Sequence, residues 1–166
     1  MKQPQWKSRV RREASTSHMC EEYRLAVEQS KTREELIDLY KSCVDWALEN
    51  GTPSLSLLRS EYPDCQKDGL YVDTAFHGEL LDGQQVYIFH NCKGTICVDL
   101  NVEKAIIPML YFANGCEMTV KRPDSSRIGT IGVPLYIFGQ NKITTENTDF
   151  VKFTIYREKC LGSDSK

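Results

Sequence analysis

Residues 86–98 read VYIFHNCKGTICV, and the pattern in this segment returns twice further along the chain. Three positions match in each copy. The tyrosines are Tyr87, Tyr111 and Tyr136, the residues five positions later are Cys92, Cys116 and Asn141, and those eight positions later are Thr95, Thr119 and Thr144. The tyrosines are separated by 24 and then 25 residues. Turn-forming residues lie between the matched positions, so each copy resembles a strand, a turn and a second strand.

A repeat of this length fits one coil of a β-solenoid. In such a fold, equivalent residues of successive coils stack, so we expect a column of tyrosines, a column of cysteines and asparagine, and a column of threonines. The prediction is a short β-solenoid with about 24 residues in each coil. A β-sandwich is the alternative, because Pro108 and Pro134 precede two of the tyrosines and proline is confined to sheet edges and corners.

The whole segment 63–160 is predicted to be this β-repeat region. Nine of the ten glycines and eleven of the sixteen aromatic residues lie beyond Pro63. Apolar and polar residues alternate over 96–102, 131–137 and 151–155, as in half-buried strands. No segment between these runs is long enough for a βαβ crossover helix, which excludes a parallel doubly wound sheet.

Residues 19–62 are predicted to form a helical cap of two to three helices. Thr32 and Glu35 make a capping box before a stripe of apolar residues spaced as on one helix face. Gly51 supplies the left-handed end of that helix, and Thr52-Pro53 is expected to open a third, with Thr52 as its N-cap. The fold class is therefore α+β, and we expect the helices to seal the first coil.

The charge is unevenly distributed. Residues 1–17 carry five basic residues and one acidic residue, a net charge of +4, so the rest of the −2 chain carries −6. We expect residues 1–18 to be a disordered basic tail or an upstream extension, and residues 161–166 to be a polar tail. The alternative is a nucleic-acid-binding arm that neutralises phosphates. Its cations would be Lys7, Arg9, Arg11 and Arg12.

Composition limits the cellular setting. The 166 residues include no apolar run long enough to span a membrane and no apolar segment of a secretory signal. Seven cysteines, an odd number, occur without any Cys-x-x-Cys pair, so a disulfide framework is not expected. We therefore expect a reducing location, the cytoplasm of a bacterial host, and neither a metal nor a cofactor.

Catalytic motifs are sparse. The chain has no phosphate-binding glycine loop and no Gly-x-Ser-x-Gly elbow. A hydrolase-type enzyme is an alternative function, with His77 near three carboxylates, or with Cys92 and His90 as a nucleophile and base. The three carboxylates are Asp73, Glu79 and Asp82.

Two sets of residues are candidates for binding. If Tyr87, Tyr111 and Tyr136 point outward, they form an aromatic stripe suited to a protein partner or a sugar-like ligand; if they point inward, they belong to the core. A positive loop on the rigid scaffold is the second candidate. Its basic residues are Lys121, Arg122 and Arg127.

Three segments carry a resemblance to known sequences: ELIDLY at 35–40, ALENGTPS at 47–54 and GLYVD at 69–73. The chain resembles a loosely defined set of small proteins from Bacteroides genomes, their phages and mobile elements, in which a helical segment precedes β repeats. The resemblance implies an accessory gene of a mobile element, and no functional residue carries over. We therefore expect a non-catalytic binding or assembly protein that presents its β-repeat surface to a protein partner or to a second copy of itself.

Overall fold

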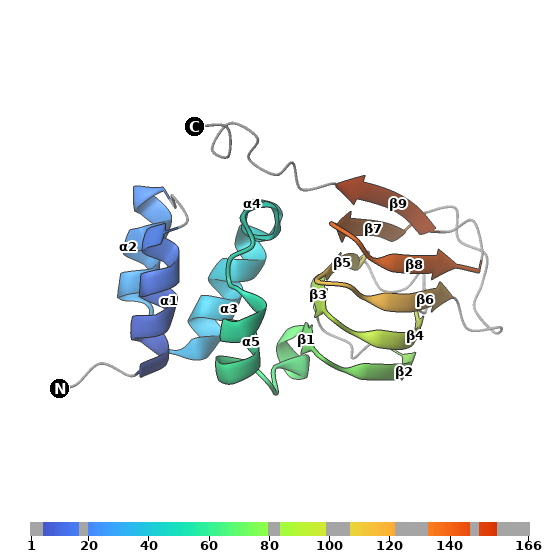
Figure 1. Ribbon diagram of the computed structural model, residues 1–166, viewed down its shortest axis with the longest axis horizontal. Coiled ribbons are helices and arrows are strands. Elements are labelled where there is room, and N and C mark those ends of the chain that lie inside the picture. Colours follow the sequence, from blue (N-terminus) through green and yellow to red (C-terminus); the bar gives the residue numbers. More distant parts are fainter. Residues whose placement is uncertain are drawn as a thin grey trace.

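The computed structural model describes residues 5–16, 20–79, 84–98, 107–121, 133–146 and 150–155. These residues form helices followed by strands, which confirms the α+β class (Figure 1). The helices are α1 (Gln5–Thr16), α2 (Glu21–Gln29), α3 (Arg33–Ser42), α4 (Val44–Asn50), α5 (Leu55–Glu61) and the 3₁₀ turn η1 (Gln66–Asp68). The strands are β1 (Leu70–Val72), β2 (Ala75–Glu79), β3 (Val86–His90), β4 (Lys93–Cys97), β5 (Met109–Ala113), β6 (Glu117–Lys121), β7 (Val133–Phe138), β8 (Lys142–Thr145) and β9 (Phe150–Ile155).

The first helix corrects the prediction for the N-terminal segment. Residues 5–16 of the expected disordered tail form α1, and the described residues contain five α-helices instead of two or three. The tail lacks an apolar stripe, but its polar side chains find partners on other helices, which sequence periodicity does not register. Residues 161–166, the predicted polar tail, lie outside the described residues.

Local signals placed the later helices partly correctly. The Thr32 hydroxyl accepts a hydrogen bond from the Glu35 amide at 3.2 Å, so the capping box begins α3. The predicted long helix is broken at Cys43, whose backbone leaves helical geometry, and Gly51 ends α4 in the left-handed conformation with φ of 65°. The N-cap of α5 is Ser54, not Thr52, because the Ser54 hydroxyl accepts from the Leu57 amide.

The strands alternate between two sheets. Odd-numbered strands form sheet A in the order β1-β3-β5-β7-β9, and even-numbered strands form sheet B in the order β2-β4-β6-β8. Every paired strand runs parallel to its neighbour. We call each odd strand together with the even strand that follows it a rung. The chain thus passes from sheet A to sheet B within a rung and returns to sheet A to begin the next.

The short corners inside the rungs repeat one backbone conformation. The first corner residue has a positive φ in every rung, namely Asp73 at 52°, Asn91 at 50°, Asn114 at 62° and Gly139 at 77°. Aspartate, asparagine and glycine are the residues that tolerate this left-handed region. The corner therefore requires these residue types, and they lie one above another along the stack.

The predicted column of cysteines and asparagine is confirmed. The Cys92 amide donates to the Cys116 sulfur at 3.3 Å, and the Cys116 amide donates to the Asn141 Oδ1 at 2.8 Å. Each side chain thus accepts a hydrogen bond from the corner backbone of the rung before it. The predicted column of threonines is also confirmed, since Thr95 pairs with Thr119 and Thr119 with Thr144.

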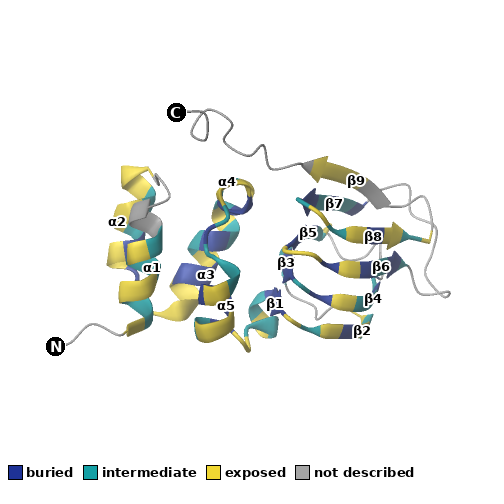
Figure 2. Cartoon of the chain, viewed as in Figure 1, coloured by how far each residue is buried: buried dark blue, intermediate teal, exposed yellow. Residues whose placement is uncertain are grey.

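Two apolar clusters lie on either side of sheet A. One fills the space between the sheets and includes Phe89, Phe112 and Ile96, all fully buried (Figure 2). The other lies between the outer face of sheet A and the helices, where Leu58 and Tyr40 pack with Ile88.

The helices cover a face of the sheets and not their end. In Figure 1, α3, α4 and α5 stand beside sheet A, with α1 and α2 beyond them. Outward-facing residues from β1 through β7 belong to the cluster under these helices, including Leu70, Tyr111 and Phe138. The expectation that the helices seal the first coil is therefore wrong, because their apolar stripe matches the long outer face of sheet A. None of the described helices is long and apolar enough to cross a membrane.

Close backbone approach makes Gly94 the most restrictive glycine in sheet B. It has φ of +119°, and a Cβ there would lie 2.0 Å from the Phe76 carbonyl oxygen. We predict that Gly94→Ala lowers the free energy of unfolding in urea by at least about 3 kcal/mol. Gly139→Ala is the control, because its φ is +77° with no atom within 4 Å of the added Cβ; it should cost about 1 kcal/mol. Equal losses in the two variants would contradict the packing argument.

Candidate functional site

The three repeat tyrosines do not form one column. Tyr87 pairs with Leu110, whereas Tyr111 pairs with Ile88 on one side and Tyr136 on the other. Tyr87 therefore points into the cluster between the sheets, and Tyr111 points outward from sheet A. The predicted column is wrong at its first member and correct at the other two.

An aromatic column does exist on the outer face of sheet A. Tyr111 stacks on Tyr136 with ring centroids 4.7 Å apart, and Tyr136 stacks on Phe153 at 5.3 Å. Tyr111 is only 3% exposed beneath the helices, and burial raises the pKa of its phenol. Phe153, at the end of the stack, is 47% exposed. Most of this column is thus core of the helix–sheet interface, and only its last member is open.

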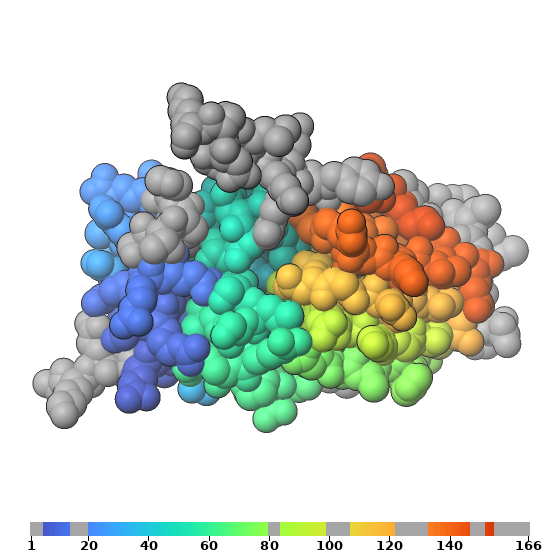
Figure 3. All heavy atoms as spheres, viewed as in Figure 1, coloured from blue at the N-terminus to red at the C-terminus, as the bar shows by residue number. Residues whose placement is uncertain are grey.

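The outer face of sheet B is the uncovered counterpart. Residues Phe76, Ile96, Met118 and Ile143 point inward and are buried, and the residues that alternate with them are exposed or half-buried. Figures 2 and 3 show no helix over these strands, which run from green to orange in Figure 3. We call this surface the free face. Its described residues are Ala75, His77, Glu79, Lys93, Thr95, Cys97, Glu117, Thr119, Lys121, Lys142 and Thr144.

Register arranges the free face in columns. The central column places His77 beside the three stacked threonines, Thr95, Thr119 and Thr144. A flanking column alternates in charge, as Lys93, Glu117 and Lys142. Adjacent strands lie about 4.8 Å apart, so hydroxyls and opposite charges recur at that spacing across a flat surface. This face can present a regular array of donors and acceptors to a partner.

A buried polar network joins the helices to sheet A at the corner. The His90 Nε2 lies 2.7 Å from the Tyr40 hydroxyl, and its Nδ1 lies 2.7 Å from the Asn114 Nδ2. The Asn114 amide donates to Nδ1, so the neutral ring carries its proton on Nε2 and donates to Tyr40. Burial lowers the pKa of His90 to about 4, against a smaller opposing effect of Asp73. The side chain is therefore neutral at pH 7.

A second polar group lies on the same corner, nearer to solvent. The Arg59 guanidinium binds both carboxylate oxygens of Asp73, at 2.6 and 2.9 Å, and the Asn91 amide donates to the same carboxylate. The Arg59 hydrogen bond lowers the pKa of Asp73, with Asn91 contributing in the same direction. Asp73 thus connects α5 to the corner and is not paired with His77.

The structure does not assemble the predicted catalytic groups. Cys92 is fully buried between the sheets, and its thiol donates to the Tyr71 and His90 carbonyls. The His90 ring lies on the helix side of sheet A, bound by Tyr40 and Asn114, so it does not serve Cys92 as a base. His77 and Glu79 are exposed on the free face, and Asp82 lies outside the described residues. Among the described residues, no group of three or more His, Cys, Asp or Glu side chains could hold a metal ion.

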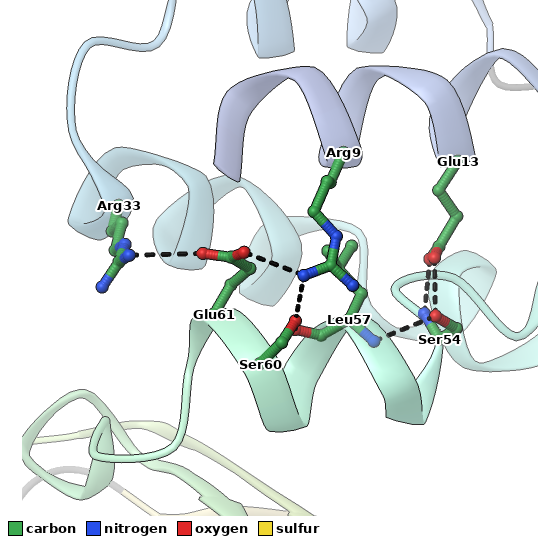
Figure 4. Close-up of polar contacts among 7 residues, drawn as sticks. All are labelled: Arg9, Glu13, Arg33, Ser54, Leu57, Ser60 and Glu61. Carbon is green, nitrogen blue, oxygen red and sulfur yellow. Dashed lines mark hydrogen bonds and ion pairs between the residues drawn. The ribbon is translucent and has the colours of Figure 1, made fainter. Parts of the chain in front are cut away.

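The basic residues of α1 make contacts within the molecule. The Lys7 ammonium donates to the Glu28 carbonyl at 2.6 Å and to the Ser30 carbonyl at 2.5 Å. Arg9 binds Ser60 and Glu61, and Glu61 also pairs with Arg33 (Figure 4). Arg11 lies 3.9 Å from the Glu28 carboxylate, and Arg12 is exposed. Of the proposed nucleic-acid contacts, Lys7 and Arg9 therefore hold α1 onto α2 and α5.

The positive loop is only partly described. Lys121 ends β6 and is half-buried on the free face. Arg122 and Arg127 lie outside the described residues. The structure brings Lys121 beside the columns of sheet B, where it pairs in register with Cys97.

Sequence reasoning missed several residues that organise the surface. Glu13 was read only as the single acid in a basic tail, yet its carboxylate accepts from the Ser54 amide, the Ser54 hydroxyl and the Thr52 hydroxyl (Figure 4). Phe153 was read as part of a strand, with no sign that it extends the tyrosine stack. The signal for Phe153 was available, because it lies 17 residues after Tyr136, close to the length of a rung without a long loop.

Glu13 provides a direct test of the docking of α1. Glu13→Ala leaves the first turn of α5 without this acceptor, and we predict a loss of about 2 kcal/mol in the free energy of unfolding. Ser8→Ala, at an exposed position of the same helix, should change it by less than about 0.5 kcal/mol. Urea denaturation of both variants measures the difference. An unchanged stability of Glu13→Ala would mean that α1 is not anchored through this carboxylate.

His90 predicts a dependence of stability on pH. A histidine in the unfolded chain titrates near 6.5, whereas burial lowers the pKa of His90 to about 4. Between these values the unfolded chain binds more protons, so stability falls as the pH drops from 6.5 to 4, by up to about 3 kcal/mol.

The control separates this effect from other acid-sensitive groups. His90→Gln should flatten the slope of unfolding free energy between pH 6.5 and 4, even though it lowers stability at pH 7. His77→Gln, at the exposed histidine of the free face, should keep the original slope. Equal slopes in His90→Gln and the unaltered chain would rule out His90 as the source.

Comparison with known proteins adds no relative from which a function could be transferred: no protein-family model matches the chain, and neither a curated protein nor a solved structure is significantly similar to it.

Proposed function

We propose that the protein is a short β-solenoid that acts as a non-catalytic binding or assembly module, with the free face as its contact surface for a protein partner. The solenoid assignment is supported by the alternation of strands between two parallel sheets and by the recurring left-handed corner. Successive rungs are then successive coils, and the long loops account for differences in their length.

The observation that carries the functional proposal is the unequal covering of the two sheets. Sheet A is covered outside by an apolar helical layer, whereas the free face of sheet B has polar residues in register over three rungs or more. A row of threonines is not needed by the core, because these side chains point away from it. Rigid strands hold the hydroxyls in place, so a partner loses little entropy in ordering them.

The proposed setting follows from the sequence resemblance. We propose an origin in a phage or mobile element and a cytoplasmic location in a bacterial host. A partner protein or a second copy of the chain is compatible with a flat, polar face of mixed charge. The interface expected is of the polar kind, with hydrogen bonds recurring along each column.

Site-specific photocrosslinking tests the proposal in cells that express the full chain. A photoreactive residue at Thr119 or Thr144 should give a defined protein adduct, and the same residue at Ser56, an exposed position of α5, should not. A second substitution, Thr95→Arg, should abolish the Thr119 adduct, because it places a bulky charge in the neighbouring position of the column.

The crosslinking outcomes are distinguishable. An adduct containing only this chain would identify self-assembly, and an adduct with another protein would identify a partner. Adducts of equal yield from Ser56 and Thr119, or none from the free face, would contradict the proposal.

A further inference from the structure

The stack of rungs ends in a step. Sheet A has five described strands and sheet B has four, so β9 extends one strand beyond the edge of β8 (Figure 1). Among the described residues, β8 pairs only with β6. The place of one further strand beside β8 is therefore bordered by β9 on the opposite side of the core.

Backbone groups of β8 point into this place. The Lys142 and Glu146 amides donate toward β6, to the Cys116 and Val120 carbonyls. Because successive residues of a parallel strand point to opposite sides, the amides and carbonyls of Ile143 and Thr145 face away from β6. The contact recorded at this edge is from the Lys152 Nζ of β9, 3.4 Å from the Ile143 carbonyl oxygen.

A groove with a volume of about 490 Å³ lies at the step. Its apolar surface comes from Ile137 and Ile143, and its charged surface includes Lys142 and Lys152. Neither lysine forms an ion pair with a carboxylate among the described residues. Glu117 also lines the groove, but its side chain belongs to the column on the free face.

We infer that the edge of β8 is an acceptor site for an extended, acidic segment of a partner protein. The segment would pair its backbone with Ile143 and Thr145, as in the addition of a strand to a sheet edge. Alternate side chains would face the groove, so an apolar residue would contact Ile143 and a carboxylate would meet the Lys152 ammonium.

Charge favours this occupant over a second copy of the chain. A second copy would bring its own β9 to the step, and with it a second Lys152 at the groove. Two ammonium groups in one groove repel each other, and an inward-pointing lysine is a known means of keeping sheet edges from self-pairing. An acidic segment reverses that effect and uses the same lysine for recognition. The site is separate from the free face, so the two proposals can fail independently.

The test uses the full chain and a synthetic peptide, acetyl-Thr-Val-Thr-Glu-Thr-Val-amide, in an NMR titration. On binding, the Ile143 and Thr145 amides should shift and exchange more slowly with solvent, while the Thr95 amide on the free face should not. A peptide with Lys in place of Glu should bind about tenfold more weakly. A peptide with Pro in place of the central Thr should lose binding, because it cannot complete the backbone pairing.

Matched variants locate the charge. Lys152→Gln should remove most of the preference for the glutamate peptide, and Lys93→Gln, on the free face, should retain it. The inference is overturned if both peptides bind equally, if Lys152→Gln changes nothing, or if the Ile143 amide gains no protection. It is also overturned if sedimentation shows that the unliganded chain dimerises through this edge, or if acetate alone reproduces the shifts at β8. Loss of crosslinking at the free face would leave these results unaffected.

Discussion

Parallel pairing in register along the stack is the constraint on which the rest of this structure depends. Each strand bonds to the equivalent strand of the next rung, so a residue at one position lies directly on its counterpart. Side chains therefore meet like neighbours at strand spacing, whether they are stacked rings, threonines or corner residues. The corner is the least tolerant part, because its left-handed residue must recur in every rung for the two sheets to stay aligned.

The helical layer gives this stack two unlike sides. An isolated pair of polar-faced sheets would expose Ile88, Tyr111 and Phe138, which instead form a core with the helices. The hydrogen bond from His90 to Tyr40 fixes where α3 meets the sheet, since a buried neutral imidazole requires partners for both nitrogens. The contacts of Arg9 and Glu13 then add α1 and α2 as an outer pair (Figure 4).

The sequence was sufficient for the α+β class, for most strands and for two of the three repeat columns. It failed at Tyr87 because the register is 23 residues before the corner of the third rung and 24 after it, as Ile88 pairs with Tyr111 but Thr95 with Thr119. The extra corner residue is Gly115. A shift of one residue moves a strand side chain to the opposite face, so a match in spacing put Tyr87 on the wrong side of sheet A.

The helical errors have a different physical cause. The sequence pattern of α1 contains few apolar residues, and its helix is held by long polar side chains whose partners lie more than twenty residues away, such as Ser30 for Lys7 and Glu61 for Arg9. Periodicity reports only which face of a segment is apolar, and it carries no information on such distant pairs. The site was harder still, because the free face is defined by what does not cover it, and covering is a property of the tertiary arrangement.

The same construction separates the parts that maintain the fold from the parts free to serve recognition. Corner residues and inward residues of each rung contact the rungs on both sides, so a change at Asn91 or Gly94 is transmitted through the stack. The threonines of the free face contact their column neighbours but fill no space between the sheets. Substitution there alters the chemistry offered to a partner at little cost to packing. A protein built this way can change what it binds while keeping one scaffold, which is a reason to look for its function on surfaces and edges and not in its interior.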